Sequence, residues 1–340
     1  MPQTKIKSGK ELALSITKAA SQQTYYTIRF LVDRELIADA YRAYAYFRWV
    51  DDTLDADLSS GPDRRDFVQR QQSLLEKCYR AESARDVTVE EQMLVELIQR
   101  DTGKNSGLQA YLRNMMAVMA FDAERRGRII SQTELNEYTR WLASAVTEAM
   151  HYFIGHSCYS PRTEARYLAV TAAHITHMLR DTHADVQVGY FNIPHEALEA
   201  TRLAPQDVGS DAYRAWVRGR VQLARSYFRA GRDYLNQVEN PRCRLAGIAY
   251  MARFEGVLDL IERDGYLLRA TYPERTGLGN IARASGSIFA AFIPRPGTRL
   301  VTPAPPVHQR SLRQFKISAS ICANLRNLRS SFLPREQLRK

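Results

Sequence analysis

Two aspartate pairs, 130 residues apart, are the side chains in this sequence best suited to chemistry. Asp51, Asp52 and Asp55 stand in YFRWVDDTLDAD, and Asp181 and Asp185 stand in MLRDTHAD. Each segment has the form D-x-x-x-D, and in a helix this spacing puts both carboxylates on one face, about 6 Å apart at Cβ. Two such faces turned toward each other would form an all-oxygen site for a hard divalent cation. Mg²⁺ takes carboxylates, waters and phosphate oxygens in this way.

The neighbours of both pairs suit a ligand that carries phosphate. Tyr44 and Arg48 share the predicted helix face of the first pair, and Arg180 adjoins the second. Arginine can hold phosphate oxygens through two parallel hydrogen bonds. Metal ions and arginines together stabilise a departing diphosphate, and a carbocation remains behind. The pattern therefore predicts chemistry that begins with ionisation of a diphosphate.

Two histidines, His174 and His177, lie on the predicted face of the second pair, and a Glu148-x-x-His151 motif precedes them. Imidazole suits zinc or iron better than magnesium, so a transition-metal site is one interpretation. A di-iron carboxylate bundle uses two Glu-x-x-His motifs, however, and the sequence has one. We therefore expect His174 and His177 to hydrogen-bond Asp181 or a phosphate group.

Helices must position these motifs, and the sequence predicts little else between about residues 8 and 272. Apolar residues recur at spacings of three and four, and alternating, strand-like runs are scarce. Polar breaks that contain glycine interrupt the pattern at residues 57–63, 101–107 and 204–210. Pro194 and Asn240-Pro241 mark further helix ends. The expected fold class is all-α.

The chain divides into three predicted segments: a helical domain (1–275), an extended, Pro-rich linker (276–308) and a basic amphipathic tail (309–340). The tail holds eight Lys and Arg residues against one acid, so it carries +7 of the net charge of +11. This uneven distribution argues against nucleic acid as a partner. A basic amphipathic helix can lie on an anionic membrane surface, although the tail could instead pack on the core or be disordered.

No apolar run approaches the ~18 residues of a membrane-spanning helix, and the first 20 residues lack the apolar centre of a signal peptide. We therefore expect a cytoplasmic protein. The tail offers a peripheral contact on the inner membrane face.

The sequence around the aspartate pairs resembles the squalene/phytoene synthase family, the head-to-head prenyl transferases, over roughly residues 21–272. YAYFRWVDDTLDAD is similar to the first aspartate-rich motif of the family, and LRDTHAD followed by Ile193-Pro194 is similar to the second. Between them, Met119-x-x-Asp122 and the Tyr138 segment with Ala145-Val146-Thr147 resemble the central helices of the family.

This resemblance implies an isoprenoid-synthase (class I terpenoid synthase) helical bundle with a central cavity, farnesyl or geranylgeranyl diphosphate as substrate, and Mg²⁺. Two substrates would join through a cyclopropylcarbinyl diphosphate. Hydride from NADPH would then give a squalene-type product, and proton loss a phytoene-type one. The carried-over metal ligands are Asp51, Asp55, Asp181 and Asp185, joined by Asp52. The carried-over diphosphate contacts are Tyr44, Arg48 and Arg180, with His174 and His177.

The sequence departs from the family pattern mainly where that cavity is expected. His174 and His177 replace a Gln and an Asn, Tyr190 and Asn192 replace an Arg and a Tyr, and Glu148 replaces a small residue. Three explanations remain open. The same diphosphates could bind with rearranged partners, a single ionisation could occur as in a cyclase or a single-substrate synthase, or the chain could be a binding or assembly protein without catalysis.

Overall fold

The computed structural model describes residues 9–57, 60–155 and 157–272, and every regular element in these ranges is helical. This confirms the predicted all-α fold class. The predicted linker and tail lie outside the described residues. In chain order the elements are α1 (Gly9–Ala20), α2 (Gln22–Leu31), the short 3₁₀ turn η1 (Arg34–Leu36), α3 (Ile37–Asp52), the π-helical turn η2 (Thr53–Asp57), α4 (Gly61–Tyr79), α5 (Val89–Arg100), α6 (Gly107–Arg125), α7 (Gln132–Phe153), α8 (Ala165–Gln187), α9 (His195–Thr201), α10 (Asp211–Leu235) and α11 (Pro241–Arg263).

Side-chain caps explain where many of these helices begin. A hydroxyl or amide oxygen at the position before the helix accepts a hydrogen bond from a backbone N–H of the first turn, which would otherwise lack a partner. Thr88 and Ser131 go further and form reciprocal capping boxes with Glu91 and Glu134. The capping residues are Ser21, Ser60, Thr88, Ser106, Ser131, Ser210 and Asn240.

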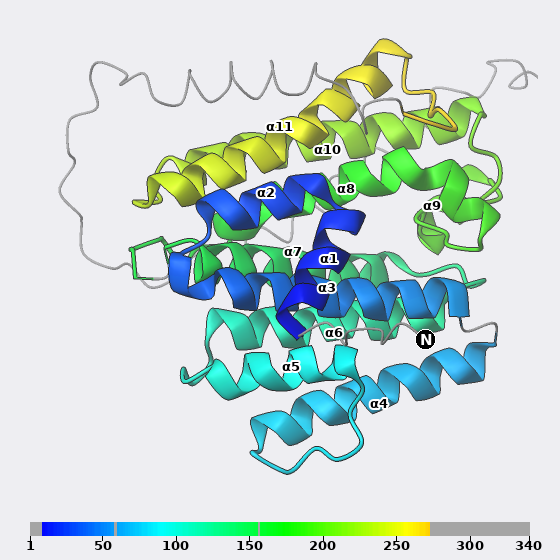
Figure 1. The fold of residues 1–340 in the computed structure, drawn as a ribbon. Helices are drawn as coiled ribbons and strands as arrows, with labels where there is room; N and C mark the ends of the chain where they lie inside the picture. Colours follow the sequence, from blue (N-terminus) through cyan, green and yellow to red (C-terminus); the bar gives the residue numbers. More distant parts are fainter. Residues whose placement is uncertain (1–8, 58–59, 156, 273–340) are drawn as a thin grey trace, which may run out of the picture. The chain divides into compact units, whose positions relative to one another are not determined.

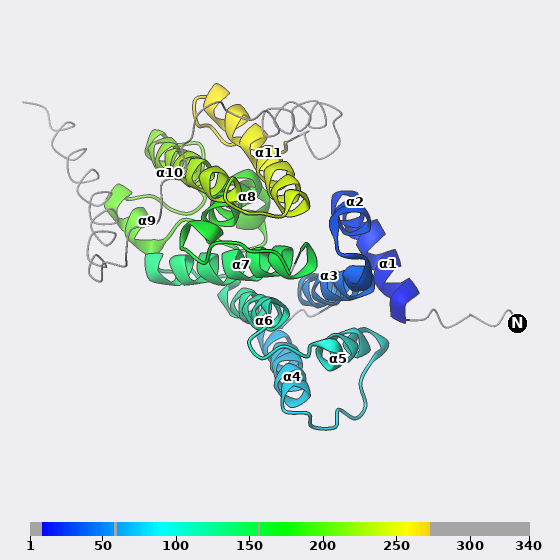
Figure 2. The same cartoon turned by 90° about the vertical axis from the view of Figure 1, so that its left-hand side faces the viewer.

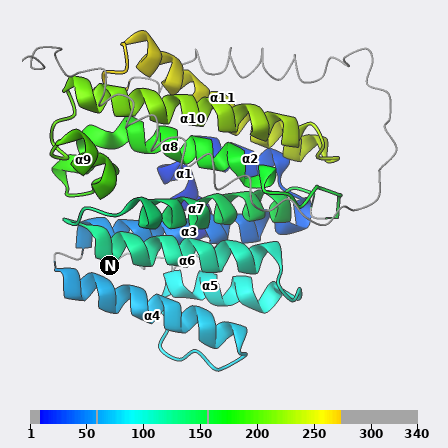
Figure 3. The same ribbon diagram turned by 180° about the vertical axis from the view of Figure 1, so that it is seen from behind.

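The long helices pack side by side around α7 and α8 (Figure 1, Figure 3). Helix α8 contacts α7, α10 and α11, while α6 contacts α7 and α4, and α3 contacts α1 and α5. Viewed from the side, α10 and α11 lie beyond α8, and α4 and α5 lie beyond α6 (Figure 2). No helix among residues 9–57, 60–155 and 157–272 is long and apolar enough to cross a membrane.

A glycine allows α10 to approach α8 closely. A Cβ atom on Gly231 would lie 2.7 Å from the Cβ of Ala169 and 2.8 Å from its backbone nitrogen. We expect Gly231→Ala to lower the free energy of unfolding by about 1–3 kcal/mol, because a backbone contact cannot relax by a rotamer change. Gly219→Ala is the matched control on the same helix, where a Cβ would meet nothing within 4 Å. Alanine favours helices over glycine by about 1 kcal/mol, so the control should be neutral or stabilised. Urea denaturation measures both, and equal effects would contradict this packing.

The fold brings three helix ends to one place. Helices α3, α6 and α8 end at Asp52, Arg125 and Gln187. The backbone N–H of Gly127, just after α6, donates to the carbonyl of Gly189, just after α8, at 2.7 Å. Both glycines have positive φ, and a Cβ on Gly189 would lie 3.2 Å from the nitrogen of Gly127. This close backbone contact fixes the end of α6 beside the end of α8, and the aspartate motifs stand at these ends.

Candidate functional site

The first aspartate pair spans a change of helix type. Asp51 belongs to the last turn of α3, whereas Asp55 lies in the π-helical turn η2. The predicted helix therefore continues through both residues, but it changes from α-helical to π-helical geometry between them. The hydroxyl of Thr53 donates to the carbonyl of Trp49 at 2.8 Å, and such side-chain bonds compete with regular helix geometry. Asp51 and Asp55 nevertheless stay close together: burial raises the pKa of Asp51, and the charge of Asp55 raises it further.

Arg48 is paired with the carboxylates beside it. Its Nε donates to Asp52 at 3.0 Å, its Nη2 also contacts Asp52, and its Nη1 donates to Asp51 at 3.2 Å. Asp52 is more than half exposed and serves mainly as the partner of this arginine. Tyr44 is buried enough to raise its pKa, and its hydroxyl bonds with Ser21 and Thr24 at the start of α2. Both predicted diphosphate contacts therefore flank Asp51, but they already have protein partners.

In the second pair, Asp181 has more hydrogen-bond partners than Asp185. Arg180 donates to both oxygens of Asp181, at 2.8 and 2.6 Å, and His177 Nε2 lies 2.9 Å from the same group. Burial alone would raise the pKa of Asp181, but these hydrogen bonds hold it well below its usual range. Asp185 accepts a hydrogen bond from the amide of Asn192 at 2.7 Å.

A buried arginine that the predicted site did not include connects the two pairs. Arg125, near the end of α6, donates to Asp122 at 2.6 Å and to the side-chain oxygen of Asn192 at 2.9 Å. Its side chain is 7% exposed. Because Asn192 in turn donates to Asp185, a hydrogen-bonded path leads from Asp122 to the second pair. The charge of Asp122 reaches the first pair, where it raises the pKa values of Asp51 and Asp55.

Aromatic rings enclose this arginine. The guanidinium carbon of Arg125 lies 4.9 Å from the ring centre of Tyr138 and 4.8 Å from that of Tyr190, and the Tyr138 hydroxyl donates to Asp122 at 2.9 Å. Tyr190 and Asn192 stand where the family pattern has an Arg and a Tyr, and both contact Arg125. The sequence shows Asp122 and Arg125 as charges at positions i and i+3 of one predicted helix, but their partner Asn192 lies 67 residues further along the chain.

Negative charge is incompletely compensated at this place. Burial, and next the charge of Asp55, raises the pKa of Asp51 to about 6. Burial, and next the charge of Asp181, raises the pKa of Asp185 to about 6. Burial and the charge of Asp122 also raise the pKa of Asp55. Such carboxylates favour any ligand that brings positive charge.

Mg²⁺ fits this donor chemistry, because it prefers carboxylate oxygen and leaves positions for water and phosphate. No three His, Cys, Asp or Glu side chains in the described ranges stand ready around a single metal position. The two pairs would therefore each contribute one or two oxygens, and the remaining ligands would come from the substrate and solvent.

The raised pKa of Asp185 gives a testable pH dependence. A carboxyl group whose folded-state pKa lies above its unfolded value stabilises the fold most when protonated, and this stabilisation is lost as pH rises through about 6. In metal-free protein, Asp185→Asn should therefore gain more stability over the wild type at pH 8 than at pH 5. Urea denaturation in EDTA at both pH values measures the difference. A gain that is larger at pH 5 would contradict the assigned environment.

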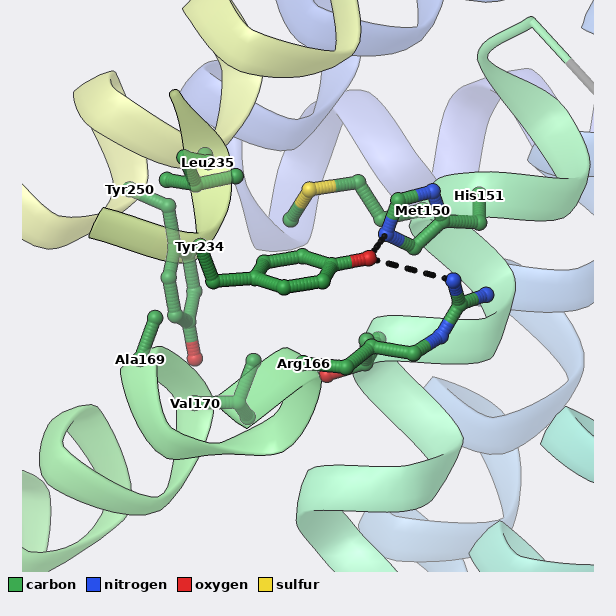
Figure 4. A pocket seen from close by; sticks show the side chains of 10 residues that line it. Met150, His151, Arg166, Ala169, Val170, Tyr234, Leu235 and Tyr250 are labelled. Atoms are coloured by element: carbon green, nitrogen blue, oxygen red, sulfur yellow. Dashed lines mark hydrogen bonds between the residues drawn. The ribbon is translucent and has the colours of Figure 1, made fainter. Parts of the chain in front are cut away.

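The histidines divide into two groups. His177 hydrogen-bonds Asp181 as predicted, whereas both ring nitrogens of the buried His174 lack a hydrogen-bond partner in the described structure. His151 lies in a small pocket among α7, α8, α10 and α11, where its Nε2 and the Tyr234 hydroxyl are 3.2 Å apart (Figure 4). Arg166, in the same pocket, also bonds Tyr234 (Figure 4).

Glu148 does not join a metal cluster. Both of its oxygens accept hydrogen bonds from Arg166, at 2.8 and 3.0 Å, and the Tyr167 hydroxyl donates to it at 2.9 Å. Burial would raise its pKa, but these partners lower it. The Glu148-x-x-His151 motif thus forms part of an ion-paired contact between α7 and α8, which leaves the transition-metal interpretation without support from these two residues.

Comparison with known proteins identifies similar sequences. The family described as squalene/phytoene synthase matches residues 17–277. A 15-cis-phytoene synthase of Synechocystis is 31% identical over 112 residues, which cover 32% of this chain and 33% of the relative. Phytoene synthase 3 of Zea mays, a chloroplastic protein, is 29% identical over 175 residues, which cover 48% of this chain and 41% of the relative. The matched segments thus span well under half the length of these curated relatives.

Solved structures share the fold. A squalene synthase from Alicyclobacillus acidocaldarius superposes with a TM-score of 0.62 at 20% identity, covering 77% of this chain and 95% of that one. A dehydrosqualene synthase in complex with ligand gives a TM-score of 0.64 at 15% identity, covering 83% and 96%. At these identities the likeness establishes the isoprenoid-synthase type of helical fold.

Proposed function

Because the chain belongs to the squalene/phytoene synthase family, we propose that it condenses two prenyl diphosphates head to head. The substrates would be farnesyl or geranylgeranyl diphosphate. The reaction would pass through a cyclopropylcarbinyl diphosphate to a squalene-type or phytoene-type product, with release of diphosphate. The observation that supports this proposal is that Asp122 and Arg125 link the two aspartate pairs. Asp122 lies close enough to add to the raised pKa values of Asp51 and Asp55, and its partner Arg125 reaches Asp185 through Asn192.

Mg²⁺ would be held by Asp51 and Asp55 on one side and by Asp185 with Asp181 on the other. When bound, it would act as a Lewis acid that stabilises negative charge on the departing diphosphate. The raised pKa values of Asp51 and Asp185 support this assignment, since both carboxylates lack enough positive charge nearby. Asp122 accepts hydrogen bonds from Arg125 and Tyr138. It would orient both side chains and add negative charge beside the metal site.

The protein side chains would bind and orient the diphosphate. Arg48 lies on the exposed side of the first pair and would exchange its contacts with Asp52 for phosphate oxygens. Arg180 is buried and fixed on Asp181, so its contribution would be to orient that carboxylate and add positive charge. In the first chemical step the C1–O bond breaks and its electron pair leaves with the diphosphate. The double bond of the second substrate then attacks C1, and loss of a proton closes the cyclopropane ring.

An assay of diphosphate release tests the proposal. Purified protein with farnesyl or geranylgeranyl diphosphate and Mg²⁺ should release diphosphate, and EDTA should stop the release. The absence of release from either substrate would count against the proposed reaction.

A binding role without catalysis is the second candidate, and one observation favours it. Asp181 is saturated by Arg180 and His177, which limits its use as a metal ligand in this conformation. Mg²⁺-dependent turnover in the assay above would rule this candidate out. The alternative of a cyclase or single-substrate synthase was suggested by Glu148, which replaces a small residue of the family pattern. Glu148 is ion-paired with Arg166, so we do not favour this alternative.

A further inference from the structure

Helix α2 exposes a pair of stacked aromatic rings. Tyr26 is 52% exposed and Phe30 is 67% exposed, which makes Phe30 the most exposed large apolar side chain in the described ranges. The two ring centres are 6.1 Å apart with an angle of 9° between the ring planes, because a spacing of four puts both side chains on one helix face. Ile28, on another face of α2, is buried. Two large rings directed together toward solvent indicate a contact surface for a partner with an apolar part.

Positive charge accompanies these rings. Arg29 is exposed beside them, and its guanidinium carbon lies 6.0 Å from the ring centre of Phe30. Helix α2 contains no acidic residue that could neutralise this charge. Just beyond the helix, Arg34 and Glu35 are both exposed and offset each other. The exposed face of α2 is therefore both aromatic and basic.

Helix α11 lies beside α2 and places an arginine at each end of it (Figure 1, Figure 2). Arg253 donates to the side-chain oxygen of Gln23 at 3.0 Å, near the start of α2. Arg242 donates to the carbonyl of Leu31 at 3.0 Å, at the end of α2. The side chain of Arg242 remains 44% exposed although it also pairs with Asp33. Arginines thus flank the aromatic pair along the direction of the helix.

The charge of this face decides which partner it suits. A second copy of the chain would bring the same arginines together, because a twofold interface pairs a surface with itself. The chain's own tail, residues 309–340, has eight Lys and Arg residues against one acid and would be repelled as well. An anionic membrane surface offers negative charge to the arginines and an apolar layer to the rings.

We propose that Tyr26, Arg29 and Phe30 of α2, flanked by Arg242 and Arg253 of α11, form a surface that binds an anionic lipid membrane. The two rings of this α2 surface would enter the boundary between headgroups and acyl chains, where amphipathic helices bury their apolar faces. The arginines would contact the lipid phosphates. A membrane would also hold the long apolar chains of the substrates and product, and this part of the proposal rests on the proposed function.

Flotation of the full chain with lipid vesicles tests the α2 surface without turnover. Wild-type protein should bind vesicles of phosphatidylcholine and phosphatidylglycerol more tightly than vesicles of phosphatidylcholine alone. Replacing both rings, by Tyr26→Ser with Phe30→Ser, should weaken binding to the anionic vesicles by about tenfold, because the apolar contact is lost. Tyr159→Ser is the matched control, since Tyr159 lies outside α2 and is 64% exposed, and it should bind like the wild type. Equal binding of the wild type and the ring variant would overturn the proposal.

Arg29→Gln tests the contribution of charge. It should weaken binding to the anionic vesicles by about fivefold, and the difference from the wild type should shrink as salt is added. Arg229→Gln, at an exposed position on α10, is the matched control and should bind like the wild type. If Arg29→Gln loses binding while the ring variant keeps it, the surface recognises charge alone, as an acidic protein would provide. That result would contradict the membrane assignment.

Folding and self-association are measured on the same variants in the absence of lipid. The substituted side chains are exposed, so melting temperatures should match the wild type. If the double variant does not fold, Phe30→Ser carries the test, and Phe30→Trp should bind at least as tightly as the wild type because tryptophan favours membrane interfaces. A ring variant with a smaller mass than the wild type in analytical ultracentrifugation would show that the rings join two copies, and would overturn the proposal.

The α2 surface and the proposed reaction can fail separately. Vesicle binding needs no substrate, and diphosphate release is measured without vesicles. Absent turnover with ring-dependent vesicle binding would contradict only the reaction. Turnover with vesicle binding that ignores the rings would contradict only the membrane surface.

Discussion

Asp51→Asn and Asp185→Asn are each expected to reduce diphosphate release on the order of a thousandfold while leaving the protein folded. Both changes replace a charged oxygen ligand by a neutral amide of the same shape. The proposed Mg²⁺ would lose one of its few protein ligands, and the developing negative charge on diphosphate would lose its stabilisation. Rates of diphosphate release at saturating Mg²⁺ measure the effect.

Stability should move in the opposite direction to activity in these variants. Burial and like charges raise the pKa of both carboxyl groups, so their ionised forms are unfavourable in the metal-free protein near neutral pH. Removing the charge should therefore maintain or raise the melting temperature. Asp66→Asn, an exposed residue on α4, is the control and should change neither quantity. An inactive variant that is also unfolded would not support the assignment, and a fully active Asp51→Asn would contradict it.

Arg125→Met is expected to lower the free energy of unfolding by about 3 kcal/mol, because it leaves the partly buried Asp122 without its counter-charge. The side chain of Arg125 is 7% exposed and contacts Asp122, Asn192 and two tyrosine rings, so solvent cannot replace these interactions. Arg125→Lys keeps the charge but loses the planar fork, and it should show an intermediate loss. Urea denaturation at pH 7 measures both.

A surface ion pair is the control for this prediction. Arg140 is 63% exposed on its side chain and pairs with Glu137, and Arg140→Met should cost less than about 1 kcal/mol. Adding Asp122→Asn to Arg125→Met should restore part of the lost stability, since the two groups are directly coupled. If Arg125→Met lowers the free energy of unfolding no more than Arg140→Met does, the contacts of the buried arginine do not stabilise the fold as proposed.

Local sequence signals predicted the helices and the family, but not the partners within the site. Hydrophobic periodicity and capping residues such as Thr88 and Ser131 act over a few residues, so they are readable along the chain. The pairing of Arg125 with Asn192 joins α6 to the segment after α8, and no local pattern encodes such a contact. The break in helix type at Thr53 likewise depends on a side-chain bond to Trp49 rather than on propensity.

The sequence placed some of the side chains around the second pair, but not all of their hydrogen bonds. Spacing placed Arg180 and His177 near Asp181, and the structure shows them bonded directly to it. Sequence alone could not show that His174, three residues earlier than His177, would lack any such bond. The difference arises because α8 faces two environments, with Asp181 beside His177 and the ring of Tyr138 beside His174.

Mass spectrometry of the product tests the central claim most directly. The protein would be incubated with Mg²⁺ and farnesyl or geranylgeranyl diphosphate, with and without NADPH, and the hydrocarbon fraction would be analysed. Head-to-head condensation predicts a product that contains the carbon atoms of two prenyl chains and no phosphate. A product with the carbon atoms of a single prenyl chain, or unchanged substrate, would contradict it.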